Sequence, residues 1–220
     1  MIPIPAGPYF GGLTNDQVRS IKSGRPSWSD IGSEIKLPAF QIAKFPVTNR
    51  EFARFVAATR RLPPRHWDSY EPADQLLDHP VTWVNWAAAN AYCEWLRAET
   101  GLPYRLPTAQ EWEKAARGPD RRWFPWGDQF DPSRCHFRSR STAPVAKHVP
   151  AGDSPYQVSD MAGNAREWTS TLTGTSSPTM VVRGGGFLAR SEHELWCAFK
   201  DEITGAAKAS IGFRVAITQD

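Results

Sequence analysis

The chain has 220 residues, 40% of them hydrophobic and 12% aromatic, which is enough for one domain with a sizeable core. Its formal net charge of +3 is small and its Lys and Arg residues are scattered, which argues against a nucleic-acid partner. No apolar run approaches the roughly 18 residues that a membrane span needs, and Pro and Gly near the N-terminus interrupt any signal-peptide pattern. We therefore expect a soluble, cytoplasmic protein with no membrane partner.

The first predicted helix begins after Thr48. Thr48 and Glu51 form a capping-box pattern, in which the side chain of each residue accepts a hydrogen bond from the backbone N–H of the other. Apolar residues follow at helical spacing. The pattern predicts a helix over residues 49–59.

Two more helices are marked by similar signals. Asn85 is a typical N-cap residue, an apolar stripe follows it, and Gly101 can end the helix in the left-handed conformation. Thr108 and Glu111 repeat the capping-box pattern before a short helix that ends near Gly118.

After Gly118 the pattern becomes irregular, with short extended pieces at residues 180–183 and 213–217. The ten Trp and nineteen Pro residues suit long loops that aromatic side chains hold in place. The sequence contains no internal repeat. It therefore predicts a loop-rich α+β fold.

Three blocks near the C-terminus, at residues 160–170, 183–187 and 212–215, carry a family resemblance. They resemble, in the same order, the GNxWEW, RGGSF and GFR blocks of the formylglycine-generating enzyme, or sulfatase-modifying factor, family. Arg166 stands where that family usually has Trp. Matching blocks cover nearly the whole chain, at residues 4–10, 45–52, 79–84, 105–118, 124–128 and 143–145. The resemblance implies one domain over residues 1–220 with a variant of the C-type lectin fold.

The family's activity rests on two cysteines that bind copper and activate oxygen, and their positions fall here on Ala189 and Glu194. Cu(I) is a soft ion that prefers sulfur, which neither side chain offers. Cys197 aligns better with a non-catalytic cysteine of the family. We therefore expect no bound copper and no catalytic residues of the family's kind.

The three cysteines, Cys93, Cys135 and Cys197, are an odd number without CxxC spacing. In the family a disulfide can join the position of Cys93 to the position that is Val215 here. This bridge cannot form, which fits a reducing compartment.

Iron is also not expected. Relatives that make sulfoxides bind iron through histidines on an additional helical domain, which has no counterpart in this sequence. The five histidines show no helical i,i+4 pairing or other ligand spacing: His66, His79, His136, His148 and His193. His79, before a proline, is most simply a structural histidine.

The resemblance implies one structural calcium ion. In the family, one side-chain oxygen, two backbone carbonyls and a Glu carboxylate hold it, and the matching positions are Asp160, Gly163, Ala165 and Glu167. The alternative is that Asp160 caps a turn and Glu167 pairs with an Arg. A second calcium site of the family should be lost, because His136 stands in place of its Asn.

With the scaffold kept and the catalytic residues missing, the function we expect is recognition of a protein or peptide without catalysis. In the family, the groove that holds the two cysteines binds an extended peptide. The corresponding groove here would be formed by Ala189, Arg190, Glu192, His193, Glu194, Trp196 and Lys200. An aromatic anchor among mixed charges is typical of a surface that recognises a protein.

Two versions of this hypothesis remain open: a partner module in a bacterial multi-component system, and a variable protein of the kind made by diversity-generating retroelements. The alternative is an oxidoreductase that forms formylglycine with copper, or a related oxygenase. A chemistry in which Glu194 and His193 act as acid and base belongs to the same alternative. The sequence leaves the ligand and the oligomeric state open.

Overall fold

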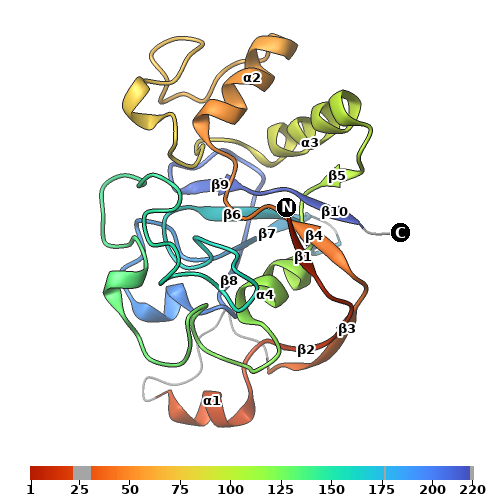
Figure 1. The fold of residues 1–220 in the computed structure, drawn as a ribbon, viewed down its shortest axis with the longest axis vertical. Coiled ribbons are helices and arrows are strands. Elements are labelled where there is room, and N and C mark those ends of the chain that lie inside the picture. Colours follow the sequence, from red (N-terminus) through yellow and green to blue (C-terminus); the bar gives the residue numbers. More distant parts are fainter. Residues whose placement is uncertain (22–30, 176, 219–220) are drawn as a thin grey trace.

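The structure is a computed structural model that describes residues 1–21, 31–175 and 177–218. Its α-helices are α1 (Asn15–Ser20), α2 (Asn49–Thr59), α3 (Trp86–Thr100) and α4 (Ala109–Arg117). Short 3-10 helices lie at Asp74–Leu76, Pro132–Arg134 and Glu192–Leu195. The strands are β1 (Ile2–Ile4), β2 (Gly7–Gly11), β3 (Ser33–Leu37), β4 (Phe40–Ile42), β5 (Tyr104–Arg105), β6 (Arg166–Thr173), β7 (Thr179–Arg183), β8 (Lys200–Ile203), β9 (Ile211–Phe213) and β10 (Ala216–Thr218). This is the predicted loop-rich α+β architecture (Figure 1).

The three predicted helices are confirmed, and so are their caps. The Thr48 hydroxyl accepts from the backbone N–H of Glu51 at 3.3 Å, and the Glu51 carboxylate accepts from the N–H of Thr48 at 2.8 Å. Thr108 and Glu111 make the same exchange. The helix that follows Asn85 ends at Gly101, which is left-handed with φ 71°. Helix α1 was not predicted, because it is only six residues long.

The strands form two four-stranded sheets, ordered β1-β4-β10-β5 and β8-β7-β6-β9, and a two-stranded antiparallel sheet of β2 with β3. The prediction of one extended piece over 213–217 was wrong, because the segment is divided between the two sheets. Strand β9 pairs in parallel with β6, whereas β10 pairs antiparallel with β4 and β5. The chain changes sheet at Arg214 and Val215.

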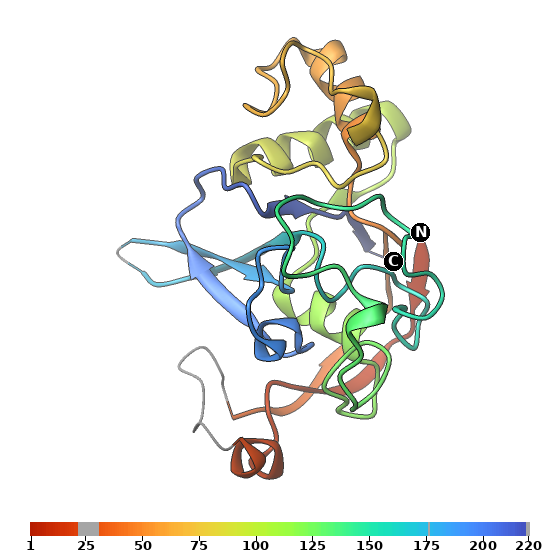
Figure 2. The same ribbon diagram turned by 90° about the vertical axis from the view of Figure 1, so that its left-hand side faces the viewer.

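The largest core cluster packs α2 and α3 against the sheet β8-β7-β6-β9. Its centre is aromatic: the rings of Phe52 and Tyr92 stack at 5.7 Å, and the ring of Phe213 meets Tyr92 edge-on at 5.3 Å. Figure 2 shows these two helices at one end of the molecule and α1 at the opposite end.

A buried ion pair fixes the point where the chain changes sheet. Arg214 and Glu167 are both fully buried, and two bonds of 2.7 Å join the guanidinium to the carboxylate. The indole N–H of Trp112 donates to the same carboxylate at 2.8 Å. The remaining N–H groups of the guanidinium donate to the carbonyls of Ala43, Lys44 and Ser159. Arg214 thus connects β6 to two loops, and Glu167 connects β6 to α4.

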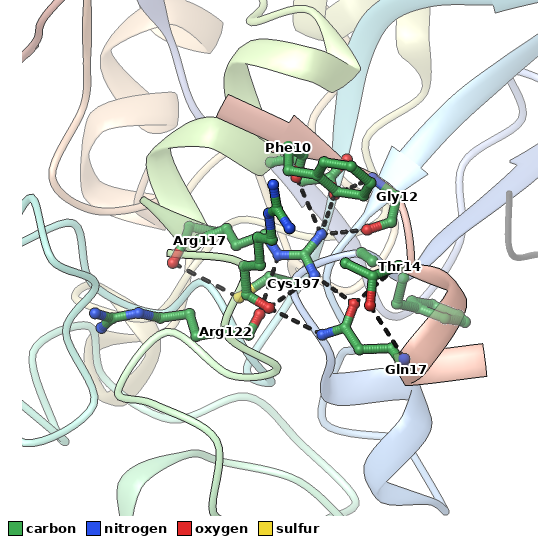
Figure 3. Close-up of polar contacts among 12 residues, drawn as sticks. Phe10, Gly12, Thr14, Gln17, Arg117, Arg122 and Cys197 are labelled. Carbon is green, nitrogen blue, oxygen red and sulfur yellow. Dashed lines mark hydrogen bonds and ion pairs between the residues drawn. The ribbon is translucent and has the colours of Figure 1, made fainter. Parts of the chain in front are cut away.

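A second buried arginine, Arg117 at the end of α4, holds the N-terminal part of the chain (Figure 3). Its guanidinium donates to the carbonyls of Phe10 and Gly12 in the β2 region and to the side-chain oxygen of Gln17 in α1. It also pairs with Glu113 at 3.2 Å. Helix α1 has no fully buried residue, so it is placed by polar contacts with the end of α4 and by Val18, which packs against a core cluster.

Within the residues that the structure describes, no helix has the length and apolar character needed to cross a membrane.

Replacing Arg214 by Met should lower the free energy of unfolding by about 3–5 kcal/mol, because the Glu167 carboxylate would stay buried without its positive partner. Arg50→Met is a matched control, since Arg50 pairs with Asp78 on the surface and its loss should cost less than about 1 kcal/mol. Urea unfolding followed by Trp fluorescence measures both. Equal losses in the two variants would contradict a structural role for the buried pair.

Candidate functional site

Six of the seven predicted groove residues lie in the loop that follows β7, and the seventh, Lys200, begins β8. Two of the six, Ala189 and Glu194, hold the loop together. Ala189 is buried in a core cluster with Leu195 and Trp196. The Glu194 carboxylate accepts from the backbone N–H of Arg190 at 2.9 Å and of Ser191 at 3.1 Å, so it caps the 3-10 helix of this loop. The two residues that the resemblance matches to the family's cysteines therefore stabilise the loop.

Three of the predicted residues, Glu192, His193 and Trp196, do line a cavity, of about 590 Å³. Its other walls come from α1 and from the loop after α4: Ser20, Ile21, Trp123, Phe124, Asp128, Gln129 and Phe130. We call this cavity the aromatic groove. The rings of Trp123 and Trp196 lie 4.2 Å apart and those of His193 and Trp196 4.4 Å apart, so the wall is a continuous layer of rings.

Sequence reasoning missed the residues between Trp123 and Phe130 as part of the site. The signal was present, because residues 124–128 match a block of the family and the segment is rich in aromatic residues. No pattern in the sequence around residues 123–130 indicates that they lie against residues 192–196, some 70 positions further along the chain. The backbone N–H of Cys197 donates to the carbonyl of Trp123 at 2.7 Å, which brings the two loops together.

The structure separates the two remaining predicted residues from the groove. Arg190 is exposed beside it. Lys200 lines a different cavity, of about 250 Å³, together with Tyr9, Glu113 and Arg183. There the Glu113 carboxylate already accepts hydrogen bonds from Arg183, Arg117 and the backbone of Gly12, so the charged wall of this second cavity serves the fold.

The three cysteines are free and buried in the core. Cys93, Cys135 and Cys197 belong to three different core clusters, so no two of them form a pair. Burial raises the pKa of each thiol to about 12. Figure 3 shows the Cys197 sulfur, which donates to the carbonyl of Ala116 at 3.6 Å. None of these thiols offers the thiolate that nucleophilic or copper chemistry requires.

The residues that match the family's calcium ligands are only partly available to a cation. Both carboxylate oxygens of Glu167 are bonded to Arg214, as the alternative reading of the sequence proposed. Asp160 is different, since its buried Oδ2 atom has no hydrogen-bond partner and burial raises the pKa of the carboxyl to about 6. Among the described residues, no group of three or more His, Cys, Asp and Glu side chains could hold a metal ion.

Three histidines have local structural partners. His79 contacts the hydroxyl of Thr142 at 2.9 Å, His136 the carbonyl of Ser141 at 2.9 Å, and His148 the carbonyl of Ser133 at 2.8 Å. His193 packs on Trp196 in the wall of the aromatic groove.

Comparison with known proteins places this geometry in a family. Residues 1–219 match the family described as sulfatase-modifying factor enzyme 1-like domain. The chain is 28% identical to the formylglycine-generating enzyme of Bos taurus, over 98% of the chain and 74% of the relative. It is also 28% identical to the inactive C-alpha-formylglycine-generating enzyme 2 of Bos taurus, over 86% of the chain and 76% of the relative.

Among solved structures, the Treponema denticola variable protein 1 superposes with a TM-score of 0.79 at 20% identity. The alignment covers 100% of this chain and 95% of the other. The fold is therefore the C-type lectin-like fold of this family, as expected from the resemblance.

The buried thiols should not react with Ellman's reagent in the native protein, either at pH 8 or at pH 10. A native pKa of about 12 keeps each thiol protonated over this range, whereas in guanidinium chloride all three should react, and faster at the higher pH. The absorbance of the released thionitrobenzoate measures this. A thiol that reacts within minutes in the native protein at pH 8 would contradict the assignment.

Proposed function

Because the chain belongs to the sulfatase-modifying factor enzyme 1-like family and yet has Ala189 and Glu194 at the positions of the catalytic cysteines, we propose that it binds a protein or peptide segment in the aromatic groove without catalysis. The proposal is carried by the structural roles of the side chains at positions 189 and 194. One is buried in the core and the other caps a 3-10 helix. Neither presents a reactive group to the groove.

The aromatic groove has the character of a binding site for an extended chain. Trp123 and Phe130 are half-buried, so they keep part of their ring surface for a ligand while their neighbours fix their orientation. Rigid aromatic walls bury a large area at a small entropic cost, which is why such side chains dominate binding energies. The groove also has polar groups, on Asp128, Gln129 and Glu192, that can select among ligands.

Two relatives support a binding role. One is named an inactive formylglycine-generating enzyme, so the family includes a protein described as lacking the activity. The other is named a variable protein, which is consistent with the retroelement version of the hypothesis. An adjacent reverse transcriptase gene and a near-copy template repeat would support that version. A gene neighbourhood without them would leave the partner-module version.

The enzymatic alternative has a direct test. The chain should leave a peptide with the Cys-containing sulfatase motif unchanged in the presence of copper and oxygen, because no thiolate stands in the groove to bind Cu(I). Mass spectrometry of the peptide measures the conversion. Formation of formylglycine would overturn the proposal, and the bovine enzyme would serve as the positive control.

A peptide selected on this protein from a random library about 12 residues long should depend on the aromatic groove. Phe130→Ala should weaken its binding about thirtyfold, which corresponds to about 2 kcal/mol for a central aromatic contact. Leu62→Ala is a matched control, because Leu62 is 84% exposed and lies outside the groove. Fluorescence anisotropy of the labelled peptide measures both affinities. Failure to enrich any peptide, or equal affinities for the two variants, would contradict the proposal.

We further propose a structural calcium ion at Asp160. The orphaned Oδ2 atom fits a cation, and the carbonyl groups of Gly163 and Ala165 would complete the oxygen ligands. Glu167 fits less well, because Arg214 already neutralises it. A bound ion would supply positive charge to a buried carboxylate and so stabilise the turn.

Calcium should therefore raise the melting temperature of the chelator-treated protein but not that of Asp160→Asn. At a concentration 100 times the dissociation constant, the gain is about 2.7 kcal/mol. Asn tolerates the left-handed backbone of residue 160, where φ is 57°, so this variant removes the charge and leaves the turn unstrained. Differential scanning calorimetry with calcium and with chelator measures the shift. An equal response of both proteins, or none in either, would contradict the proposal.

A further inference from the structure

The loop that packs Phe137 against Phe130 of the aromatic groove has an unusual charge pattern. Residues 132–152 contain no Asp or Glu, although they include four basic residues: Arg134, Arg138, Arg140 and Lys147. Arg134 pairs with Asp131, which precedes this stretch. Arg138 and Arg140 are exposed and form no ion pair with any residue that the structure describes, and the same is true of Arg190. We call these three residues the arginine rim.

Backbone contacts place two members of the arginine rim side by side. The N–H of Arg138 donates to the carbonyl of Ala189 at 3.3 Å, and the N–H of Ser139 donates to the carbonyl of Phe187 at 2.8 Å. The guanidinium of Arg138 also donates twice to the carbonyl of Arg190, at 3.2 and 2.9 Å. The Arg138 guanidinium is thus held against the backbone of Arg190, a second exposed arginine. Such an arrangement favours an anionic ligand.

One member of the arginine rim, Arg138, adjoins the aromatic groove through two ring contacts. The Arg138 guanidinium lies 5.5 Å from the centre of the Phe137 ring, which meets the ring of Phe130 edge-on at 5.5 Å. Phe130 lines the groove. On the same loop as Arg190, Leu188 is 51% exposed and adds an apolar surface. Apolar and cationic groups therefore form one surface.

We infer that the bound segment is acidic, with Asp or Glu carboxylates on the arginine rim and an apolar side chain in the aromatic groove. Guanidinium groups bind carboxylates through paired, charge-assisted hydrogen bonds, which gives them geometric selectivity as well as strength. The inference rests on the proposed function, because it assumes that the groove binds a peptide. It adds the chemical class of the partner and two residues, Arg138 and Arg140, outside the loop that follows β7.

A peptide fits this surface better than a nucleic acid. Nucleic-acid binding needs many cations that follow successive phosphates. Here Asp128 and Glu192 line the groove next to the arginine rim, and they would repel a continuous polyanion. A peptide can place an apolar residue beside these carboxylates and its own acidic residues on the arginines.

The test is a selection from a library of random peptides, about 12 residues long, on the wild-type protein and on the triple variant Arg138→Glu, Arg140→Glu, Arg190→Glu. Peptides from the wild type should be enriched in Asp and Glu beside an apolar residue, and those from the variant in Lys and Arg. The wild-type peptide should bind the variant at least tenfold more weakly. Its affinity for the wild type should fall as salt is raised from 50 to 300 mM.

The matched control reverses three other exposed arginines: Arg54→Glu, Arg60→Glu and Arg61→Glu, on α2 and just after it. It changes the net charge by the same amount and should leave the affinity within twofold. Circular dichroism establishes that both triple variants are folded.

The remaining outcomes separate this inference from the proposed function. Peptides that lose affinity in Phe130→Ala but show no acidic preference would overturn the inference and leave the groove as a peptide site. Failure to enrich any peptide would overturn both. A single-stranded oligonucleotide that binds more tightly than the selected peptides, and is lost in the arginine-rim variant, would overturn the inference in favour of a nucleic acid.

Discussion

The structure depends on a carboxylate and a guanidinium that are buried together. Burying charge is costly unless each group is paired and hydrogen-bonded, and Glu167 and Arg214 meet this condition with one another, with Trp112 and with three backbone carbonyls. The pair stands where the chain leaves one sheet for the other. It therefore joins the two sheets and α4, and a loop-rich chain gains a fixed frame from which its loops extend.

The sheets and the loop that follows β7 are stabilised by different residues. The same fold can therefore carry loops with different functions. Arg214 and Arg117 hold the sheets and the N-terminal segment, whereas Glu194 caps the loop that follows β7. The Glu194 carboxylate accepts hydrogen bonds from the backbone N–H groups of Arg190 and Ser191. A thiol at this position would leave these N–H groups without a strong acceptor. Position 194, which the resemblance matches to one of the family's cysteines, has a structural role here, and an aromatic surface lies beside it.

The charges of the core and of the site follow opposite rules. In the core every arginine lies against a carboxylate or several carbonyls, since an unpaired buried charge would destabilise the fold. On the arginine rim, solvent stabilises the charges, and we propose that a ligand pairs with them. A positive surface without an internal partner, next to a layer of aromatic rings, is the combination that our proposal assigns to an acidic peptide.

The sequence alone determined the features that depend on neighbours along the chain. Capping boxes act between residues three positions apart, so Thr48, Asn85 and Thr108 marked their helices correctly, and the absence of sulfur at positions 189 and 194 is visible in the sequence itself. Only the tertiary structure divided residues 213–217 between two sheets, moved Lys200 to another cavity and brought Phe130 to the site. These features arise from contacts between segments far apart in the chain, and a local pattern does not encode which distant partner a side chain meets.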